Sequence, residues 1–351
     1  MKRTLGLTLL LFATLFSCMR QEKPLPAELS RAESVMWEHP DSALSILRSM
    51  PQSSLSSGKN YATWALLLAQ ARDKVYGKRL PDSLNIPFSD KLVQDAMDYF
   101  EKEGNLKRMA QTYYYKGQLL KDQKKITEAM PFFLKSKEMM TKLDEPLFTY
   151  LICQSLGNTY RYQDLYEESL VQLKDAYQYA LRSGNGERIS YALSELGRTY
   201  VHKNEMDSAL FYFGKSLDNA QRLGNIELEA MAMGELGVVY NKLSQGEKAL
   251  HYTRKELDLC LQISSLHKLP QVYYKIGSAF WSLGQLDSAK VYFQKSLETD
   301  NLYTLNEAYE VLYYICVEQK LYKEAIEYNN QYLIYSDSLQ VINHAGELAE
   351  I

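Results

Sequence analysis

The stretch Leu196-Gly197-Arg198-Thr199-Tyr200 decides the fold, because it recurs at a fixed spacing along the chain. Leu156-Gly157-Asn158-Thr159-Tyr160 lies 40 residues before it, and Leu236-Gly237-Val238-Val239-Tyr240 lies 40 residues after it. Gly117 and Gly277 extend the series at the same spacing. A period in this range is the mark of a repeat protein, in which each repeat packs on its neighbours.

Other residue types keep fixed distances from each glycine. A small residue stands twelve positions later in every unit: Ala129, Ser169, Ala209, Ala249 and Ala289. The position sixteen residues after the glycine is large and apolar in four of the five units: Phe133, Leu173, Phe213 and Phe293, with Thr253 in the fourth unit. Residues three and four apart share one face of a helix. Each unit therefore reads as two helices, and we expect the glycine to let the second helix approach the first closely.

The ends of the units carry a second signal. Gly104, Gly184 and Gly224 occupy the same place in the repeat, and each is followed by asparagine. Glycine is the residue that most easily adopts the left-handed conformation in which many helices end. These three glycines therefore predict the points at which one unit stops and the next begins.

The order of residues within a unit resembles the tetratricopeptide repeat. The third unit carries the pattern most fully: Leu193, Leu196, Gly197, Tyr200, Ala209 and Phe213. The period of 40 residues is longer than the 34 residues usual for that family, and it is similar to the long-repeat variant found in bacterial peptide-sensing regulators. The resemblance implies an all-α fold, a right-handed superhelical solenoid of antiparallel helix pairs.

The first 26 residues read as a targeting segment. Lys2-Arg3 is a positive start, and the apolar run that follows is too short to span a bilayer, which is typical of a secretory signal. Leu15-Phe16-Ser17-Cys18 resembles a bacterial lipobox, which implies that residues 1–17 are a lipoprotein signal peptide, that Cys18 carries lipid, and that residues 18–26 are a tether. The alternative is an ordinary signal peptide with a chance cysteine. Surface-exported lipoproteins of some Bacteroidota resemble one another in carrying an acidic run after this cysteine. No such run follows Cys18, so the resemblance implies a periplasm-facing anchor in the bacterial cell envelope.

The rest of the chain divides into repeats of differing regularity. Residues 27–107 are expected to be degenerate helical repeats that cap the solenoid, since terminal repeats are usually atypical; part of this segment resembles the amino-terminal region of Bacteroides-type repeat lipoproteins. Residues 108–302 hold the five clear repeats, residues 303–335 a sixth, degenerate repeat, and residues 336–351 the start of a C-terminal helix.

Composition and motifs give no support to catalysis. The net charge of −3 provides no basic field, which disfavours nucleic-acid binding. None of the five histidines has metal-ligand spacing, and we expect no catalytic residue, metal or cofactor. The cysteines that remain after Cys18 lie in different units, and they are expected to be buried free thiols: Cys153, Cys260 and Cys316.

A binding groove is the functional surface that remains. In the family that this chain resembles, groove residues come from the first helix of each unit, including the position directly after the glycine. The residues of this chain that fall there are Gln118, Asn158, Arg161, Arg198, Asn241 and Trp281. The amides could hold a peptide backbone, the arginines a carboxylate, and the tryptophan an apolar side chain; simple solvation of a wide groove is the alternative.

The sequence therefore predicts a membrane-anchored module that binds a protein or peptide in its groove and has no catalytic activity of its own. The alternative is the sensory part of a signalling or transcription regulator whose output module is missing from this chain. The sequence favours no particular oligomeric state.

Overall fold

The computed structural model describes residues 24–76 and 90–348, and every regular element in these two ranges is a helix. The predicted signal peptide and the predicted lipidation site, Cys18, lie outside the described residues. The chain divides into two compact units, of which the first ends at Gly104 and the second begins at Asn105.

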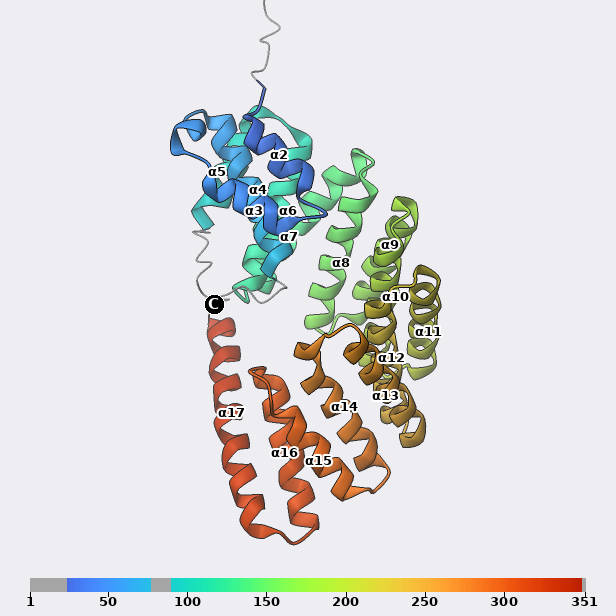
Figure 1. The fold of residues 1–351 in the computed structure, drawn as a ribbon. Helices are drawn as coiled ribbons and strands as arrows, with labels where there is room; N and C mark the ends of the chain where they lie inside the picture. Colours follow the sequence, from blue (N-terminus) through green and yellow to red (C-terminus); the bar gives the residue numbers. More distant parts are fainter. Residues whose placement is uncertain (1–23, 77–89, 349–351) are drawn as a thin grey trace, which may run out of the picture. The chain divides into compact units, whose positions relative to one another are not determined.

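The first unit is a small helical array in which successive helices pack together (Figure 1). Its elements are α2 (Ala27–Val35), α3 (Pro40–Ser49), the short 3-10 helix η1 (Gln52–Leu55), α4 (Gly58–Tyr76) and α5 (Asp90–Glu103). Leu29, Leu47 and Phe100 are almost entirely buried and anchor its core.

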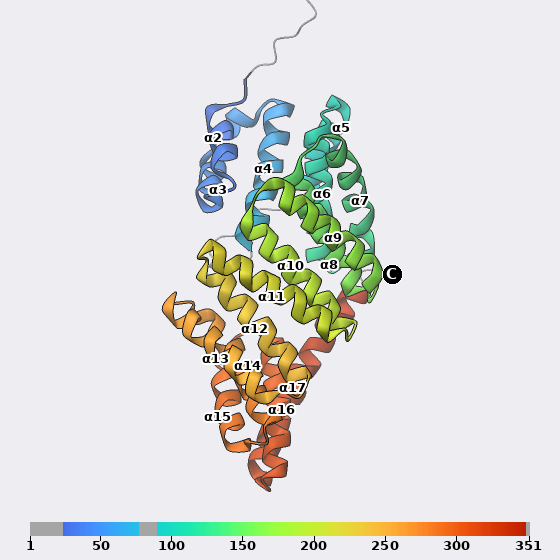
Figure 2. The ribbon, with the colours of Figure 1, turned by 90° about the vertical axis from the view of Figure 1, so that its right-hand side faces the viewer.

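The second unit consists of six helix pairs. The pairs are α6 (Leu106–Asp122) with α7 (Ile126–Lys142), α8 (Pro146–Tyr162) with α9 (Tyr166–Ser183), α10 (Gly186–His202) with α11 (Met206–Leu223), α12 (Ile226–Lys242) with α13 (Gly246–Gln262), α14 (Leu269–Ser282) with α15 (Leu286–Ser296), and α16 (Leu302–Glu318) with α17 (Tyr322–Leu348). Each helix packs on its partner and on the next helix along the chain, so the pairs form a continuous, turning array (Figures 1 and 2). The predicted all-α solenoid of antiparallel helix pairs is confirmed.

The periodic glycines lie where the two helices of a pair touch. A Cβ atom built on Gly197 would come within 2.6 Å of the Phe213 ring, and one built on Gly157 would come within 2.5 Å of Leu173. The partner residues at this position are buried in all five repeats. The close approach predicted from the repeat is therefore present, and the glycine makes it possible.

Left-handed residues end the second helices of the repeats. Gly184 and Gly224 have positive φ angles of 67° and 61°, as their place in the repeat predicts. The asparagine that follows each glycine caps the next helix, because its side-chain oxygen accepts a hydrogen bond from the backbone N–H three residues later. Asn185 accepts from Arg188 and Asn225 from Leu228. The capping role of these asparagines was not predicted.

The last two repeats depart from the regular spacing. Pro270 has no backbone N–H and lies in the first turn of α14, so this helix begins at Leu269 after a short 3-10 turn, η2 (Leu266–Lys268). In the sixth repeat, α17 runs without interruption to Leu348. The residues from 336 to 348, expected to start a helix, are thus the continuation of α17.

Candidate interaction surface

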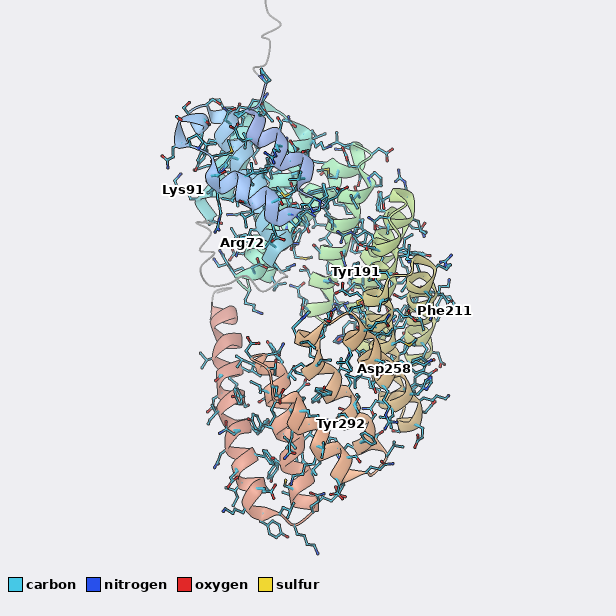
Figure 3. All side chains as sticks on the ribbon, in the orientation of Figure 1. Arg72, Lys91, Tyr191, Phe211, Asp258 and Tyr292 are labelled. Carbon is cyan, nitrogen blue, oxygen red and sulfur yellow. The ribbon has the colours of Figure 1, made fainter. Side chains whose placement is uncertain are left out.

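The first helix of each repeat, here called the A helix, lies on the inner side of the turning array. Consecutive A helices contact each other from α8 to α16, while no comparable contact joins consecutive second helices, or B helices, in the part of the chain that the structure describes. Helices that are closer together lie on the inside of a curve. In Figure 3, the labelled Tyr191 on the A helix α10 and Phe211 on the B helix α11 mark the two sides of the third repeat.

All six predicted groove residues lie on A helices, one or two on each A helix from α6 to α14. In chain order they are Gln118 on α6, Asn158 and Arg161 on α8, Arg198 on α10, Asn241 on α12 and Trp281 on α14. The surface that carries them is called the A-helix face below. The six residues are spread over five repeats, so they line an extended surface and do not form a single cluster.

Two of the predicted arginines belong to a chain of ion pairs that joins three repeats. Arg161 Nη1 lies 2.7 Å from Glu195 Oε2, and Arg198 Nη1 lies 2.7 Å from Glu195 Oε1. Arg198 Nε also donates a hydrogen bond of 2.7 Å to Glu235 Oε1. These four residues are called the arginine–glutamate ladder; they link α8, α10 and α12 and carry no net charge.

The ladder is held in a partly dehydrated environment. The side chains of Arg161 and Glu195 are only 11% and 10% exposed. Burial disfavours the charged form of Arg198, but the charges of Glu235 and Glu195 outweigh this effect and hold the pKa of Arg198 above its ordinary value. The guanidinium therefore stays charged, and an incoming carboxylate must compete with two carboxylates of the protein itself.

The sequence reasoning missed the two glutamates. Both stand two residues before the periodic glycine, at Glu195 and Glu235. Glu195 precedes Arg198 by three residues, which places the two side chains on the same helix face. That spacing was the available signal, whereas the contact with Arg161 depends on how two repeats pack.

The predicted amides leave acceptor atoms without a partner. The side-chain oxygens of Gln118, Asn158 and Asn241 are shielded from solvent and accept no hydrogen bond from the protein. Gln118 Nε2 does donate to the Tyr114 hydroxyl, at 2.7 Å. A buried acceptor without a donor costs about 1–3 kcal/mol. Each of these residues is only partly buried as a whole, so a bound peptide could supply the missing donor if the amide turned its oxygen toward the surface.

The C-terminal part of the A-helix face is different in character. Trp281 is 38% exposed on α14. On the next A helix, burial raises the pKa of Glu307, and the nearby charge of Glu310 raises it further, although a hydrogen bond with Tyr274 opposes the shift. The face is thus neutral and internally paired around α8–α12, and acidic with an exposed aromatic side chain around α14–α16.

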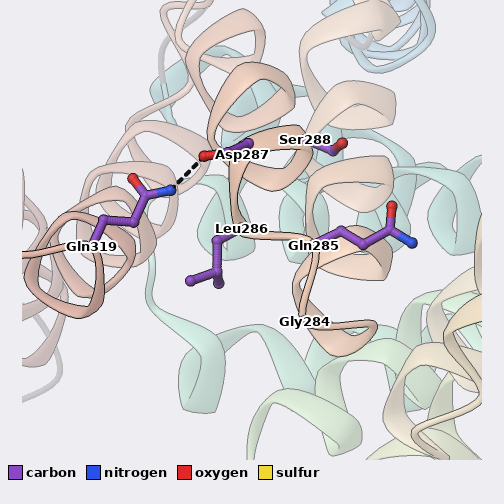
Figure 4. Close-up of a pocket in the computed structure, with 6 residues that line it drawn as sticks. All are labelled: Gly284, Gln285, Leu286, Asp287, Ser288 and Gln319. Atoms are coloured by element: carbon purple, nitrogen blue, oxygen red, sulfur yellow. Dashed lines mark hydrogen bonds between the residues drawn. The ribbon is translucent and has the colours of Figure 1, made fainter.

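Three surface hollows lie elsewhere, and none of them is lined by the six predicted residues. The hollow in Figure 4, with a volume of about 450 Å³, lies at the start of α15, where Gln319 Nε2 donates a hydrogen bond of 2.7 Å to Asp287 Oδ1. A larger one, of about 600 Å³, lies between α9, α10 and α11.

The three cysteines of the repeats are free and buried, as predicted. Burial raises the pKa of Cys153 to about 12, which keeps its thiol protonated and unreactive. Within residues 24–76 and 90–348, no cluster of three metal-ligating side chains is present. No helix in these ranges combines the length and apolar character that a membrane span requires.

Comparison with known proteins agrees with the repeat architecture. The sequence profile of the tetratricopeptide repeat matches residues 110–139, in α6–α7, and residues 270–301, which include α14–α15. No functionally curated protein matches the chain by sequence.

Several solved structures share the fold at low sequence identity. Aspartyl phosphate phosphatase F from Bacillus subtilis is 16% identical with a TM-score of 0.55, over 91% of this chain and 90% of that chain. A Rap protein complexed with competence and sporulation factor is 12% identical with a TM-score of 0.58, over 89% and 97%. A signal transduction ATPase with a tetratricopeptide repeat sensor, from Pyrococcus horikoshii, is 14% identical with a TM-score of 0.65; the match covers 92% of this chain and 48% of that one.

At these identities the structural likeness concerns the fold alone. Combined with the profile matches and the packed helix pairs, it leads to one conclusion: this chain contains tetratricopeptide repeats and folds as a tetratricopeptide-like helical solenoid.

Proposed function

We propose that this protein is a non-catalytic interaction module that holds a peptide or an extended protein segment along its A-helix face. The observation that carries the proposal is the row of partly buried amides Gln118, Asn158 and Asn241 along the A helices, whose oxygens lack a donor within the protein and would gain one by turning toward a bound segment. The tetratricopeptide-like fold supports it, as does the likeness to a Rap protein whose structure was solved in complex with competence and sporulation factor.

Each part of the face has a definite role in this proposal. The amides pair with the backbone of the bound segment, which gives affinity without strong dependence on sequence. Arg198, whose side chain is 35% exposed, can share its guanidinium with an acidic group of the segment, which competes there with Glu195 and Glu235, while Arg161 stays with Glu195. Trp281 receives an apolar side chain at the other end of the segment.

The proposal includes attachment to a membrane. A lipid on Cys18 would hold the solenoid at the cell envelope, facing the periplasm, and the short tether before α2 would keep it close to the surface. The intact mass of the protein extracted from its own membrane tests this part. Acyl chains on a chain that begins at Cys18 support it, and an unmodified Cys18 contradicts it.

A second candidate function is favoured by the likeness to the ATPase from Pyrococcus horikoshii, in which the repeats are named as the sensor. Under this alternative the solenoid binds its ligand in the same way, and a separate output module reads the bound state. The two candidates differ in what copurifies with the protein, since only the second requires a signalling partner.

The binding proposal can be tested by site-specific photo-crosslinking in the native envelope. A photoreactive residue at position 158 or 241 should capture a peptide or protein, whereas the same residue at Gln178, which is exposed on the B helix α9, should not. Asn158→Ala combined with Asn241→Ala should then lower capture from a third A-helix position at least tenfold, with circular dichroism unchanged. Equal capture from position 178, or no loss in the double variant, would contradict the proposal.

A further inference from the structure

The last helix, α17, has two faces of very different character. One face packs on α16: Ala325 and Leu339 are 3% and 9% exposed, and the Tyr335 ring stacks on Tyr309 with 5.5 Å between ring centres. Figure 1 shows α17 at the end of the array. It has 27 residues, against 17 in α16, so it is long enough to extend beyond its partner.

The opposite face of α17 is apolar and exposed. Ile326, Leu333, Ile334 and Val341 are 63%, 49%, 55% and 69% exposed. They occur at spacings of seven and eight residues, which place them along one side of the helix. An apolar stripe of this kind along a helix is the pattern of a surface that packs on another helix.

The interior repeats show what normally covers this stripe. Ile326 and Leu333 hold the places that Leu170 and Tyr177 hold in the second repeat and that Leu250 and Leu257 hold in the fourth. In those repeats the side chains pack against the A helix of the next repeat, and Leu170 and Leu250 are only 3% and 7% exposed. The stripe on α17 is therefore a repeat junction with no covering helix among the described residues.

The stripe is also self-complementary about one residue. Lys323 and Asp337 each lie seven residues from Asn330, on either side, and they carry opposite charges. Ile326 and Ile334 each lie four residues from Asn330. All five side chains are exposed, and no ion pair involves Lys323 or Asp337 within the described part of the chain.

We propose that two copies of this chain associate through α17, with the two helices antiparallel about a two-fold axis at Asn330. A two-fold interface requires that each residue meet its symmetric counterpart. In this arrangement Lys323 faces Asp337 of the second copy at both ends, Ile326 faces Ile334, and the two Asn330 amides meet at the axis. Leu333 lies opposite Glu327, so the apolar match is confined to the isoleucines. The second copy thus supplies a helix that covers the stripe.

Cysteine cross-linking tests the position of the axis. Asn330→Cys in the full chain should form an intermolecular disulfide under mild oxidation, because only a residue at the axis meets its own copy. Gln331→Cys is the matched control: it is the next exposed residue on the same helix, turned away by one helical step of about 100°. The native thiols at positions 153, 260 and 316 are buried and should not compete, and both variants carry Cys18→Ser so that the fourth cysteine cannot form the disulfide.

Charge reversal tests the pairing itself. Lys323→Asp should weaken the dimer at least tenfold in sedimentation velocity, since it places like charges at both ends of the interface. Adding Asp337→Lys should restore wild-type association, which a role of either residue in folding alone would not predict.

The proposal would be overturned if the wild-type protein stayed monomeric at about 100 µM, a concentration that detects even micromolar affinity. Equal cross-linking of Asn330→Cys and Gln331→Cys would also overturn it. So would a charge-reversal pair that fails to restore association. In cells, the thiol of Asn330→Cys could be protected from alkylation although no homodimer disulfide forms. This result would mean that a different protein or a further segment covers the stripe, and it would also reject the dimer.

Discussion

Arg161 and Glu195 join two consecutive repeats through an ion pair that is nearly closed to solvent, with Nη1 and Oε2 separated by 2.7 Å. Glu195 also pairs with Arg198 on its own helix, so one buried carboxylate serves two guanidiniums. A surface that was expected to offer two free arginines to a ligand therefore also contributes to the cohesion of the solenoid. Substitutions in this region must separate binding from stability.

Removal of the shared carboxylate should destabilise the solenoid. Glu195→Ala leaves Arg161 shielded and without an opposite charge, and loss of one partner of a buried ion pair costs about 3–5 kcal/mol. We expect the free energy of unfolding in urea to fall by an amount near the lower end of that range, because Arg198 keeps Glu235.

Glu138→Ala is the matched control for this prediction. The side chains of Glu138 and its partner Lys142 are 69% and 63% exposed, so solvent screens their ion pair. This control should leave the urea midpoint unchanged. If the urea midpoint of Glu195→Ala were the same as that of the wild type, the ladder would not stabilise the repeats.

The inter-helix glycines should not tolerate a side chain. Gly197→Ala would bring Cβ to 2.6 Å from the Phe213 ring, and forcing extra atoms into a packed core costs about 1–3 kcal/mol. We expect a lower melting temperature by calorimetry, and partial recovery when Phe213→Leu is added to make room.

Gly214→Ala makes the same chemical change at a site where we expect the melting temperature to rise. Gly214 lies inside α11, and a Cβ atom there would meet nothing within 4 Å. Alanine is favoured over glycine in a helix interior by about 1 kcal/mol, so this variant should melt at a higher temperature. If both variants were destabilised equally, close packing would not be the reason for the glycine at position 197.

The asparagine caps can be tested at α10. Asn185→Ala removes the acceptor for the Arg188 backbone N–H, and loss of such a cap costs about 1 kcal/mol. Asn185→Asp keeps an acceptor at the helix start, where a negative charge is also favourable, and should retain wild-type stability in chemical denaturation. Equal loss in both variants would mean that the amide acts through some contact other than the cap.

The fold could be predicted because the repeat presents the same information several times. Each glycine, small residue and large apolar residue recurs in register, and the close contact of Gly157 with Leu173 repeats that of Gly197 with Phe213. The asparagine caps were missed although Asn185 and Asn225 recur with the same spacing, because the neighbouring glycine already explained why a helix ends there.

Other features could not be read from the chain, because they depend on how neighbouring repeats pack. The turn between the two helices of a repeat contains a left-handed residue at Lys124, Asp164, Asn204 and Ser244. Gly284 holds the same place in the fifth repeat. Glycine, asparagine and aspartate tolerate this conformation, so the turns at Asn204 and Gly284 could be expected, whereas Lys124 carries no such signal. The pairing of Arg161 with Glu195 likewise requires the packing of α8 on α10, which no pattern within one repeat specifies.

A second buried carboxylate lies at the junction of the fourth and fifth repeats. Glu256 on α13 fits against Gly234, where a Cβ atom would come within 2.4 Å of the carboxylate. Its Oε1 accepts a hydrogen bond of 2.7 Å from Lys275, but its buried Oε2 accepts none. Burial is the main cause that raises the pKa of Glu256, and the charge of Lys275 only partly offsets it.

This raised pKa predicts a pH-dependent effect of Glu256→Gln. A carboxyl group whose pKa is higher in the folded protein contributes its full stability below the unfolded pKa and loses it as pH rises through the folded pKa. Glutamine does not ionise, so the variant should match the wild type near pH 4 and exceed it in free energy of unfolding at pH 7–8. If Glu256→Gln were less stable than the wild type at pH 8, the ion pair with Lys275 would outweigh the cost of burying the charge.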